Sequence, residues 1–346
     1  MRCHSPESLT ALATRIFVAA GWPEDEAREC ADHLVLANLS GHDSHGVAMI
    51  PVYIGAFSAG LLRPENRPVT RSESAPFLVI DANLALGQPT ANAAIRRAIA
   101  MAEAGGACIL NLLNAHHIGR VGHYAETAAA AGLVSLFWVN VAGRAPIVAP
   151  HGARQSRFGT NPHTVGVPNG DAPLILDFAT SRMAHGKARV ALNAGRQVPE
   201  GYLLDHEGNP TTDPASVFGQ PLGALLSFGE HKGAGIGVMA EILGAALGGG
   251  PIMPRTPPGA SVINSMLAIL IDPGRLDPNA ADRTRRVEEV ATFQRAARPR
   301  DGVDKVRSPG DREREIRAER RRDGIPLDDG TWQLLREAAA RVGVSV

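Results

Sequence analysis

Short apolar runs of strand type, separated by helical patterns, constrain the fold of this chain most. The runs lie at residues 77–81, 107–113 and 133–140, in two pieces, GVP and PLILDFA, within 166–179, and at 261–272. Their length and apolar character are typical of buried strands. Helical patterns lie between them at 90–104, from the loop after 113 through Tyr124 and Ala130, and at 231–249. We therefore expect the middle of the chain to mix helices and strands.

Both ends of the chain are predicted to be helical. Near the start, Ser5 is a candidate N-cap and Pro6 the first helical residue, and two further helices should follow before residue 60. After Asp282 the composition becomes dense in Arg and Glu, and 284–297, 311–322 and 329–342 are typical of charged helices. We interpret this charge as solvated helical faces joined by ion pairs.

Charge and cysteine content exclude several classes of protein. Lys and Arg total 35, as do Asp and Glu, so a chain of zero net charge has no bulk attraction to nucleic acid or anionic membrane. The three cysteines, Cys3, Cys30 and Cys108, match neither a zinc pattern nor a disulfide scaffold. The start lacks the apolar stretch of a signal peptide, and no apolar run is long enough to span a membrane. These features predict a cytoplasmic protein.

The common dinucleotide-binding motif is missing. A GxGxxG loop would be expected to follow a strand. The nearest match has Gly233 and Gly235 but Val238 at the third position, and it lies inside a helical pattern. These small residues indicate a helix-packing surface instead. A dinucleotide, if bound, must therefore be held without that loop.

Histidines gather at the junctions between predicted elements. His42 and His45 lie in a loop after the second helix, His116 and His117 between a strand and a helix, and His231 at a helix start. Junctions favour chemistry over plain packing. The histidines could bind a metal, but no HExxH motif or carboxylate pair accompanies them. Acid–base catalysis, for which an unperturbed pKa of about 6.5 is suited, needs fewer coincidences.

Seven strings of residues resemble those of the malate/L-lactate dehydrogenase type 2 family, in family order. They are GHDSHGVAMIPVY (41–53), NAHHIGRVGHYAE (114–126), RFGTNP (157–162), LDFATS (176–181), EGNPTTDP (207–214), EHKG (230–233) and GIPLD (324–328). The resemblance runs from about residue 5 to 343. Within the family, the HHIGR and SRFGTNP forms are most similar to the hydroxycarboxylate dehydrogenase B subgroup.

The resemblance implies an α/β fold of α+β type. It implies a non-Rossmann cofactor domain with a mostly antiparallel central sheet, flanked by helical regions from both chain ends. We expect residues 1–74 and 283–346 to form a helical domain. Residues 75–282 would form the cofactor-binding domain, with a helical insertion around 181–250.

The resemblance also implies an activity. It predicts an oxidoreductase that transfers a hydride between NAD, with NADP as the alternative, and a small 2-hydroxy or 2-oxo acid. A cyclic imine (ketimine) reductase of the same family is the alternative substrate class. A metal-dependent hydrolase or lyase using the histidines is a further alternative. The implied assembly is a homodimer, with no nucleic-acid or membrane partner and no metal.

Site residues follow from the matching positions. His117 falls on the catalytic histidine, as the general acid and base, and His45 on the histidine beside nicotinamide and substrate. Asp177 has two interpretations, a ribose contact or a helix cap for the segment after Thr180. The implied cofactor contacts are His45, Gly119, Arg120, Val121, Ile175, Leu176, Asp177, Phe178, Ala179, His231, Asn264, Gly310, Asp311, Arg312 and Glu313.

One position departs from the family pattern. Many members have arginine four residues after the SHG histidine, where it binds the substrate carboxylate, but this chain has Met49. A buried carboxylate without a cation is costly. We predict that Arg120 takes over this role, the alternative being that Arg120 binds only cofactor phosphate. Free backbone N–H groups at the predicted helix start near Gly119 would also suit an anion.

Overall fold

A mixed seven-stranded sheet forms the centre of the protein, in a computed structural model that describes residues 2–193, 195–256, 259 and 261–346. The strand order is β2 (Val69–Ser74), β3 (Phe77–Asp81), β4 (Ala107–His116), β12 (Ile263–Ile271), β5 (Val134–Ala142), β7 (His163–Val167) and β8 (Leu174–Phe178). Of the neighbouring pairs in this described sheet, β3 and β4 are parallel and the others antiparallel. The predicted mixture of helices and strands is confirmed.

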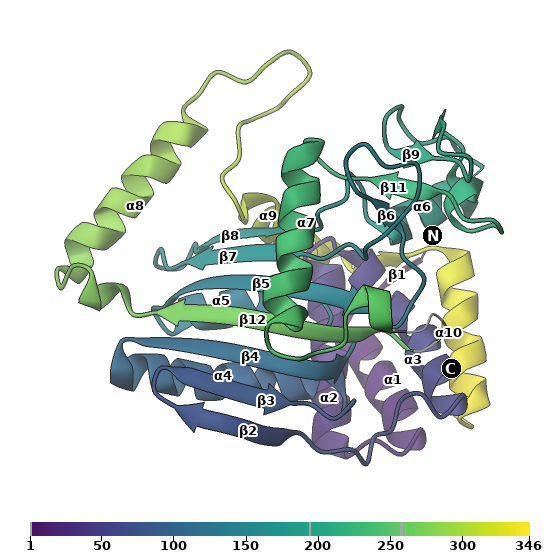
Figure 1. Cartoon of the computed structure of the whole chain (residues 1–346), viewed down its shortest axis with the longest axis horizontal. Helices are drawn as coiled ribbons and strands as arrows, with labels where there is room; N and C mark the ends of the chain where they lie inside the picture. The colour runs from purple at the N-terminus through teal and green to yellow at the C-terminus, as the bar shows by residue number, and fades with distance from the viewer. Residues whose placement is uncertain (1, 194, 257–258, 260) are drawn as a thin grey trace.

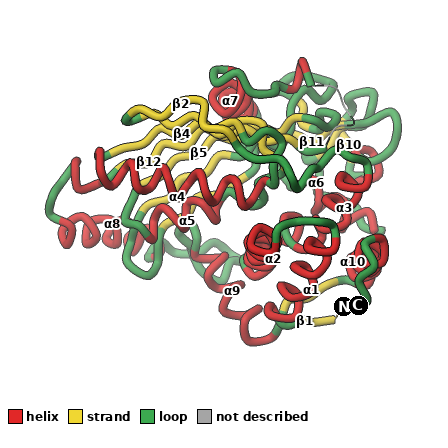
Figure 2. The backbone as a smooth tube through the Cα atoms, turned by 90° about the horizontal axis from the view of Figure 1, so that it is seen from below, coloured by secondary structure: helices red, strands yellow, loops and turns green. Residues whose placement is uncertain are grey.

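Helices cover both faces of the sheet (Figures 1 and 2). α4 (Gly87–Gly105) and α5 (Gly122–Ala130) lie on one face, and α7 (His231–Glu241) lies on the other. The single helix predicted at 231–249 is instead α7 followed by a π-helical turn, Ile242–Ala246. At Gly244 in this turn, a Cβ would lie 2.9 Å from the carbonyl oxygen of Trp138 in β5. The small residues of this segment therefore allow close packing on the sheet.

A helical cluster built from both ends of the chain packs beside the sheet (Figure 2). It contains α1 (Pro6–Ala19), α2 (Glu24–Leu39), α3 (Ile50–Ser58) and α10 (Asp329–Arg341) around one buried apolar core. Ser5 caps α1 as predicted, since its hydroxyl accepts from the Ser8 N–H. The ends are also joined by β1 (Arg2–His4), which pairs antiparallel with β13 (Ile325–Leu327). The division into two domains at the predicted boundaries stays a prediction.

A second, four-stranded sheet was not predicted. Its order is β10 (Pro210–Thr211), β9 (Leu203–Leu204), β11 (Ala224–Leu226) and β6 (Val148–Ala149), and α6 (His185–Asn193) lies with it. Short 3₁₀ helices occur at Asp43–His45, Val47–Met49, Pro214–Val217, Met253–Arg255 and Pro273–Arg275. Strands of two or three residues depend on their pairing partners rather than on a local pattern, which explains why the sequence did not indicate them.

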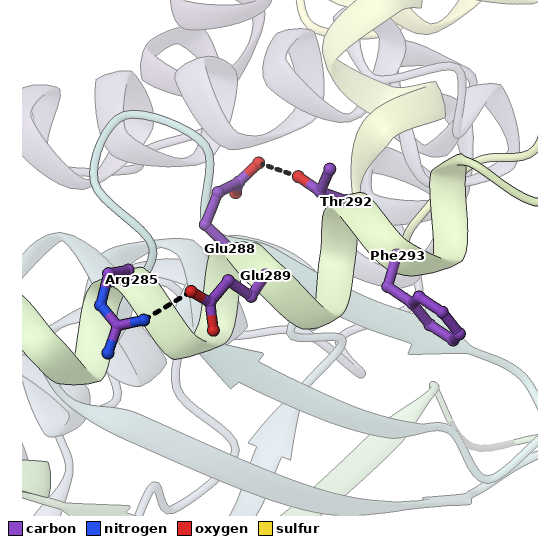
Figure 3. A pocket seen from close by; sticks show the side chains of 5 residues that line it. All are labelled: Arg285, Glu288, Glu289, Thr292 and Phe293. Carbon is purple, nitrogen blue, oxygen red and sulfur yellow. Dashed lines mark hydrogen bonds and ion pairs between the residues drawn. The ribbon is translucent and has the colours of Figure 1, made fainter.

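The charged helices after residue 282 form as predicted. α8 (Ala280–Arg295) stands apart from the sheet in Figure 1, and α9 (Asp311–Asp323) packs near α2. A shallow hollow on α8 is lined by Arg285, Glu288, Glu289, Thr292 and Phe293, with an ion pair between the first and third of these (Figure 3). Among the described residues, no helix is both long and apolar enough to cross a membrane.

Candidate active site

A tight turn after α2 carries His45. The side chain of Asn38 shapes this turn, because its amide nitrogen donates to Asp43 at 2.6 Å and its oxygen accepts from the Val47 N–H at 2.8 Å. Gly46 passes so close to Asn38 that a Cβ there would lie 2.1 Å from the amide oxygen. His45 is thereby held on the side of the turn that faces the end of β4, and Ser44 hydrogen-bonds its Nδ1 at 3.0 Å.

His117 follows the last residue of β4 and faces His45. The two imidazole rings are stacked with 5.7 Å between their centres and 25° between their planes. They come from segments 72 positions apart, so the fold assembles the pair that the sequence assigned to catalysis. Both rings are partly accessible to solvent. A small molecule could therefore reach them.

A chain of buried polar groups holds His117 from behind. The Tyr53 hydroxyl in α3 hydrogen-bonds His117 Nδ1 at 2.6 Å and accepts from Gln88 Nε2 at 2.7 Å. Gln88 in turn accepts from the thiol of Cys30 at 3.5 Å. Because Nδ1 is engaged, His117 has Nε2 left for a substrate. Sequence reasoning missed Tyr53 and Gln88, although Tyr53 ends the matched string 41–53.

Burial keeps the site histidines neutral. Desolvation, followed by the charges of His45, His116 and Arg144, holds the pKa of His117 well below its usual value. The pKa of His45 is lowered to about 4, by burial first and then by His42. Burial also lowers the pKa of His116 to about 3. In this form each ring can accept a proton.

The turn 118–121 is fixed by side chains from two other elements. Asn264 in β12 accepts from the Ile118 N–H at 3.0 Å, and His33 Nε2 in α2 accepts from the Arg120 N–H at 2.9 Å. Asn264 also donates to the Asn140 carbonyl, so both ends of its amide are engaged in holding the turn. Gly119 has φ +76°, and a Cβ there would lie 2.4 Å from His33 Nε2.

Asp177 caps a helix, but not the segment after Thr180. Its Oδ2 accepts from the Gly122 N–H at the start of α5 at 3.0 Å, and its Oδ1 accepts from the Thr164 hydroxyl at 2.8 Å. Asp177 therefore caps a helix as one interpretation expected, but the helix is α5 and not the segment after Thr180. Neither oxygen is without a partner.

Arg120 lies under the same turn, between two carboxylates. Its guanidinium is 3.1 Å from Glu126 and 3.3 Å from Asp177, and its side chain is only 2% exposed. Arg317 pairs with Glu126 at 2.8 Å, which completes a cluster of two cations and two anions. Although burial opposes the charged form, the two carboxylates raise the pKa of Arg120.

The two remaining predicted cofactor segments lie side by side. The Ile175 N–H in β8 donates to the Pro309 carbonyl at 3.2 Å, which places 175–179 next to the start of α9. Gly310, with φ +89°, precedes α9. Asp311 is engaged by Arg295, while Arg312 is exposed. Glu313 pairs with His42 at 3.2 Å, which connects this segment to the turn that carries His45.

His231 lies apart from the histidine pair, at the exposed N-terminus of α7. Its ring is 5.9 Å from that of His151. Phe228, three residues earlier, stacks edge-on against Phe178 at 5.1 Å, so His231 is connected to the 175–179 segment. Contacts therefore link Arg120 to Asp177 and the turn of His45 to Glu313, while His231 lies apart from these residues.

The histidines do not assemble a metal site. His42 pairs with Glu313, and His116 hydrogen-bonds Ser261, so these rings point to other partners. Within the described ranges, no group of three or more His, Cys, Asp or Glu residues is placed to hold a metal ion. The interpretation of the four histidines as a ligand set has no support in this geometry.

Known proteins are similar to this chain over nearly its whole length. The family model described as malate/L-lactate dehydrogenase matches residues 4–336. Hydroxycarboxylate dehydrogenase B of Escherichia coli is 43% identical over 98% of this chain and 94% of its own length. A Δ1-pyrroline-2-carboxylate/Δ1-piperideine-2-carboxylate reductase of Pseudomonas syringae is 35% identical over 95% and 94%. The structure of sulfolactate dehydrogenase from Methanocaldococcus jannaschii superposes with a TM-score of 0.88 at 30% identity, covering 99% of this chain and 98% of that one.

Proposed function

The chain belongs to the malate/L-lactate dehydrogenase family, and we propose that it reduces small 2-oxo acids, or oxidises the matching 2-hydroxy acids, with NAD(P). It is an oxidoreductase of this family. The observation that carries the finer proposal is the stacked pair of His45 and His117, with Tyr53 bound to His117 Nδ1. A histidine held at one nitrogen and free at the other suits proton exchange with a substrate oxygen.

His117 would act at the oxygen of the reacting carbon. In oxidation, Nε2 of the neutral ring takes the hydroxyl proton. In reduction, the ring must first bind a proton from solvent, and the imidazolium then gives its Nε2 proton to the carbonyl oxygen. The Tyr53 hydroxyl can either donate to Nδ1 or accept from it. It can therefore hold the ring in place in both protonation states. When bound, NAD(P)H supplies the hydride that reaches the carbon.

The turn 119–121 fits an anionic cofactor group. Gly119 and Val121 are buried, and their backbone N–H groups have no hydrogen-bond partner in the described part of the chain. Buried N–H groups without partners are rare and suit a phosphate or carboxylate oxygen. We propose that they contact the dinucleotide, with His45, Ile175–Ala179 and Gly310–Glu313 around it. Asn264 would act indirectly, by holding Ile118. His231 would contact a more distant part of the cofactor.

The closed cluster around Arg120 bears on the prediction that it binds the substrate carboxylate. Two carboxylates within 3.3 Å already compensate its charge. Its Nη2 has no hydrogen-bond partner among the described residues, but the side chain is only 2% exposed, so a substrate carboxylate would reach it only if the cluster opened. We do not carry this role into the proposed function. A homodimeric assembly and a cytoplasmic location stay predictions.

A panel of substrates tests the proposal. Pyruvate, oxaloacetate, hydroxypyruvate and Δ1-piperideine-2-carboxylate are each offered with NADH and with NADPH, and oxidation of the cofactor is followed by absorbance. We expect turnover of at least one 2-oxo acid. Turnover of the imine alone would favour the cyclic imine alternative. Oxidation of neither cofactor with any compound would refute the proposed function.

A variant tests the histidine. His117→Asn should lower kcat by about 10²- to 10⁴-fold, the usual contribution of a general acid or base. His206→Asn, at an exposed residue of the loop between β9 and β10, is the control and should keep full activity. Undiminished hydride transfer by His117→Asn would contradict the assigned role.

A further inference from the structure

A small carboxylate substrate needs a cation beside His117, if the proposed function holds. The family position for it is Met49, which packs against the apolar core of the helical cluster. Arg120 is 2% exposed and already has two carboxylate partners. The cation must therefore come from another segment that reaches the end of β4.

The topology of the sheet brings Arg144 to that place. β4 and β5 both run antiparallel to the strand between them, β12, so their C-terminal ends meet at one edge of the sheet. In the register, Ile263 of β12 pairs with His116 on one side and with Ala142 on the other. His117 follows the first strand by one residue, and Arg144 follows the second by two. Both residues therefore lie at the same edge of the sheet.

The backbone before Arg144 is tightly held. Gly143 has φ +79°, and a Cβ there would lie 2.2 Å from the carbonyl oxygen of Ser261. Only glycine accommodates this conformation together with so close an approach. Ser261 also hydrogen-bonds His116. The turn that carries Arg144 is thus fixed against the segment that supports the site histidines.

The charge of Arg144 is uncompensated. Within the described residues, no carboxylate lies within ion-pair distance of its guanidinium, and no side-chain hydrogen bond engages it. In contrast, Arg120, Arg317 and Arg320 are all paired. Arg144 is exposed to solvent, so a ligand can reach it, although neighbouring protein desolvates its guanidinium enough to lower its pKa. Its positive charge also acts on His117 and His116, adding to the larger effect of burial in lowering their pKa values.

We propose that Arg144 binds the carboxylate of the 2-oxo or 2-hydroxy acid, next to His117, in place of the arginine that is missing at Met49. Arg144 would then set the preference for acids over neutral carbonyl compounds. The planar guanidinium can hold both carboxylate oxygens at once, a geometry that lysine cannot reproduce. The carboxylate would also compensate the charge that now acts on His117.

The test compares an acid with its amide. For the 2-oxo acid that the full-length protein reduces best, KM and kcat/KM are measured for the acid and for its primary amide, at saturating cofactor. Arg144→Ala should lower kcat/KM for the acid by about 10- to 100-fold, the usual value of a charged hydrogen bond. The value for the amide and the KM for the cofactor should change little. For Arg144→Lys, kcat/KM for the acid should lie between the values of the unchanged protein and of Arg144→Ala.

Arg275→Ala is the matched control. Arg275 is an exposed arginine after the C-terminal end of β12, at the opposite edge of the sheet, and its removal should leave both substrates unaffected. Equal kcat/KM for the acid in Arg144→Ala and in the unchanged protein would overturn the assignment. An equal fall for acid and amide would also overturn it, since that result indicates a structural role. Inactivity of the unchanged protein on the whole panel would instead refute the proposed function itself.

Discussion

Removal of one buried oxygen, in Tyr53→Phe, is expected to lower both stability and catalysis. Tyr53 is fully buried, and its hydroxyl lies between His117 Nδ1 at 2.6 Å and Gln88 Nε2 at 2.7 Å. Phenylalanine would keep the ring and its packing against Phe17 and Trp22. The change therefore isolates the hydroxyl.

The structure sets the magnitude. Without the hydroxyl, one nitrogen of His117 and one of Gln88 lose their partners, and each unsatisfied buried group costs about 1–3 kcal/mol. Phenylalanine has no hydroxyl to remove from water on folding, and this saving offsets part of the cost. We therefore expect a fall of about 2–4 kcal/mol in the free energy of unfolding. Loss of the hydrogen bond that orients the His117 ring should lower kcat by about 10- to 100-fold, which corresponds to ~1.4–2.7 kcal/mol of activation free energy.

The assay pairs urea unfolding with steady-state kinetics. Tyr202→Phe removes the same atom from a hydroxyl that has no hydrogen-bond partner among the described residues, and should alter neither quantity by much. The reasoning would be refuted if Tyr53→Phe kept kcat within about twofold of the unchanged protein and unfolded at the same urea concentration as Tyr202→Phe.

Three further predictions concern stability, each measured by urea unfolding. Acidification from pH 6.5 toward pH 4 should lower the free energy of unfolding by up to about 1.4 kcal/mol per pH unit per group. Histidines whose pKa is lowered in the folded protein bind protons when the chain unfolds, so acid favours the unfolded state. These histidines are His33, His45, His116 and His117. A flat profile in this window would contradict the burial. Gly119→Ala should cost about 2 kcal/mol or more, and Gly132→Ala, with the same sign of φ but no close neighbour, about 1 kcal/mol; equal losses would argue against the contact with His33. Asp177→Asn should cost about 1–3 kcal/mol by weakening the ion pair with Arg120, while exposed Asp171→Asn should cost nothing measurable.

Elements with a strong local pattern could be predicted from the sequence. The apolar runs at 77–81 and 261–272 became β3 and β12, and Ser5 caps α1, because these features depend on neighbouring residues alone. The short strands β9, β10 and β11 could not be predicted in this way. Each has only two or three residues, too few to show a periodic pattern, and β11 also pairs with β6, more than 70 positions earlier.

For the site, the matched strings identified His45 and His117, but not what holds them. Tyr53 reads as one more apolar residue of a helix, and Gln88 as the second residue of another. Only the packing of α3 and α4 against the end of β4 brings their polar atoms to His117. These buried polar groups come from separate helices with no fixed spacing in the sequence, so no sequence pattern could have indicated them.

The same limit explains why Arg120 was the natural prediction for the carboxylate. In the sequence, Arg120 is three residues from His117. Its partners Glu126 and Asp177 lie farther along the chain, and no sequence pattern identifies them as partners. The fold buries Arg120 between these two carboxylates with its side chain 2% exposed, so a ligand has little access to its charge. What recognises an anion is charge that the protein leaves uncompensated. By that criterion we favour Arg144, which has no ion-pair partner among the described residues and lies at the same edge of the sheet as His117, 27 positions away in the sequence.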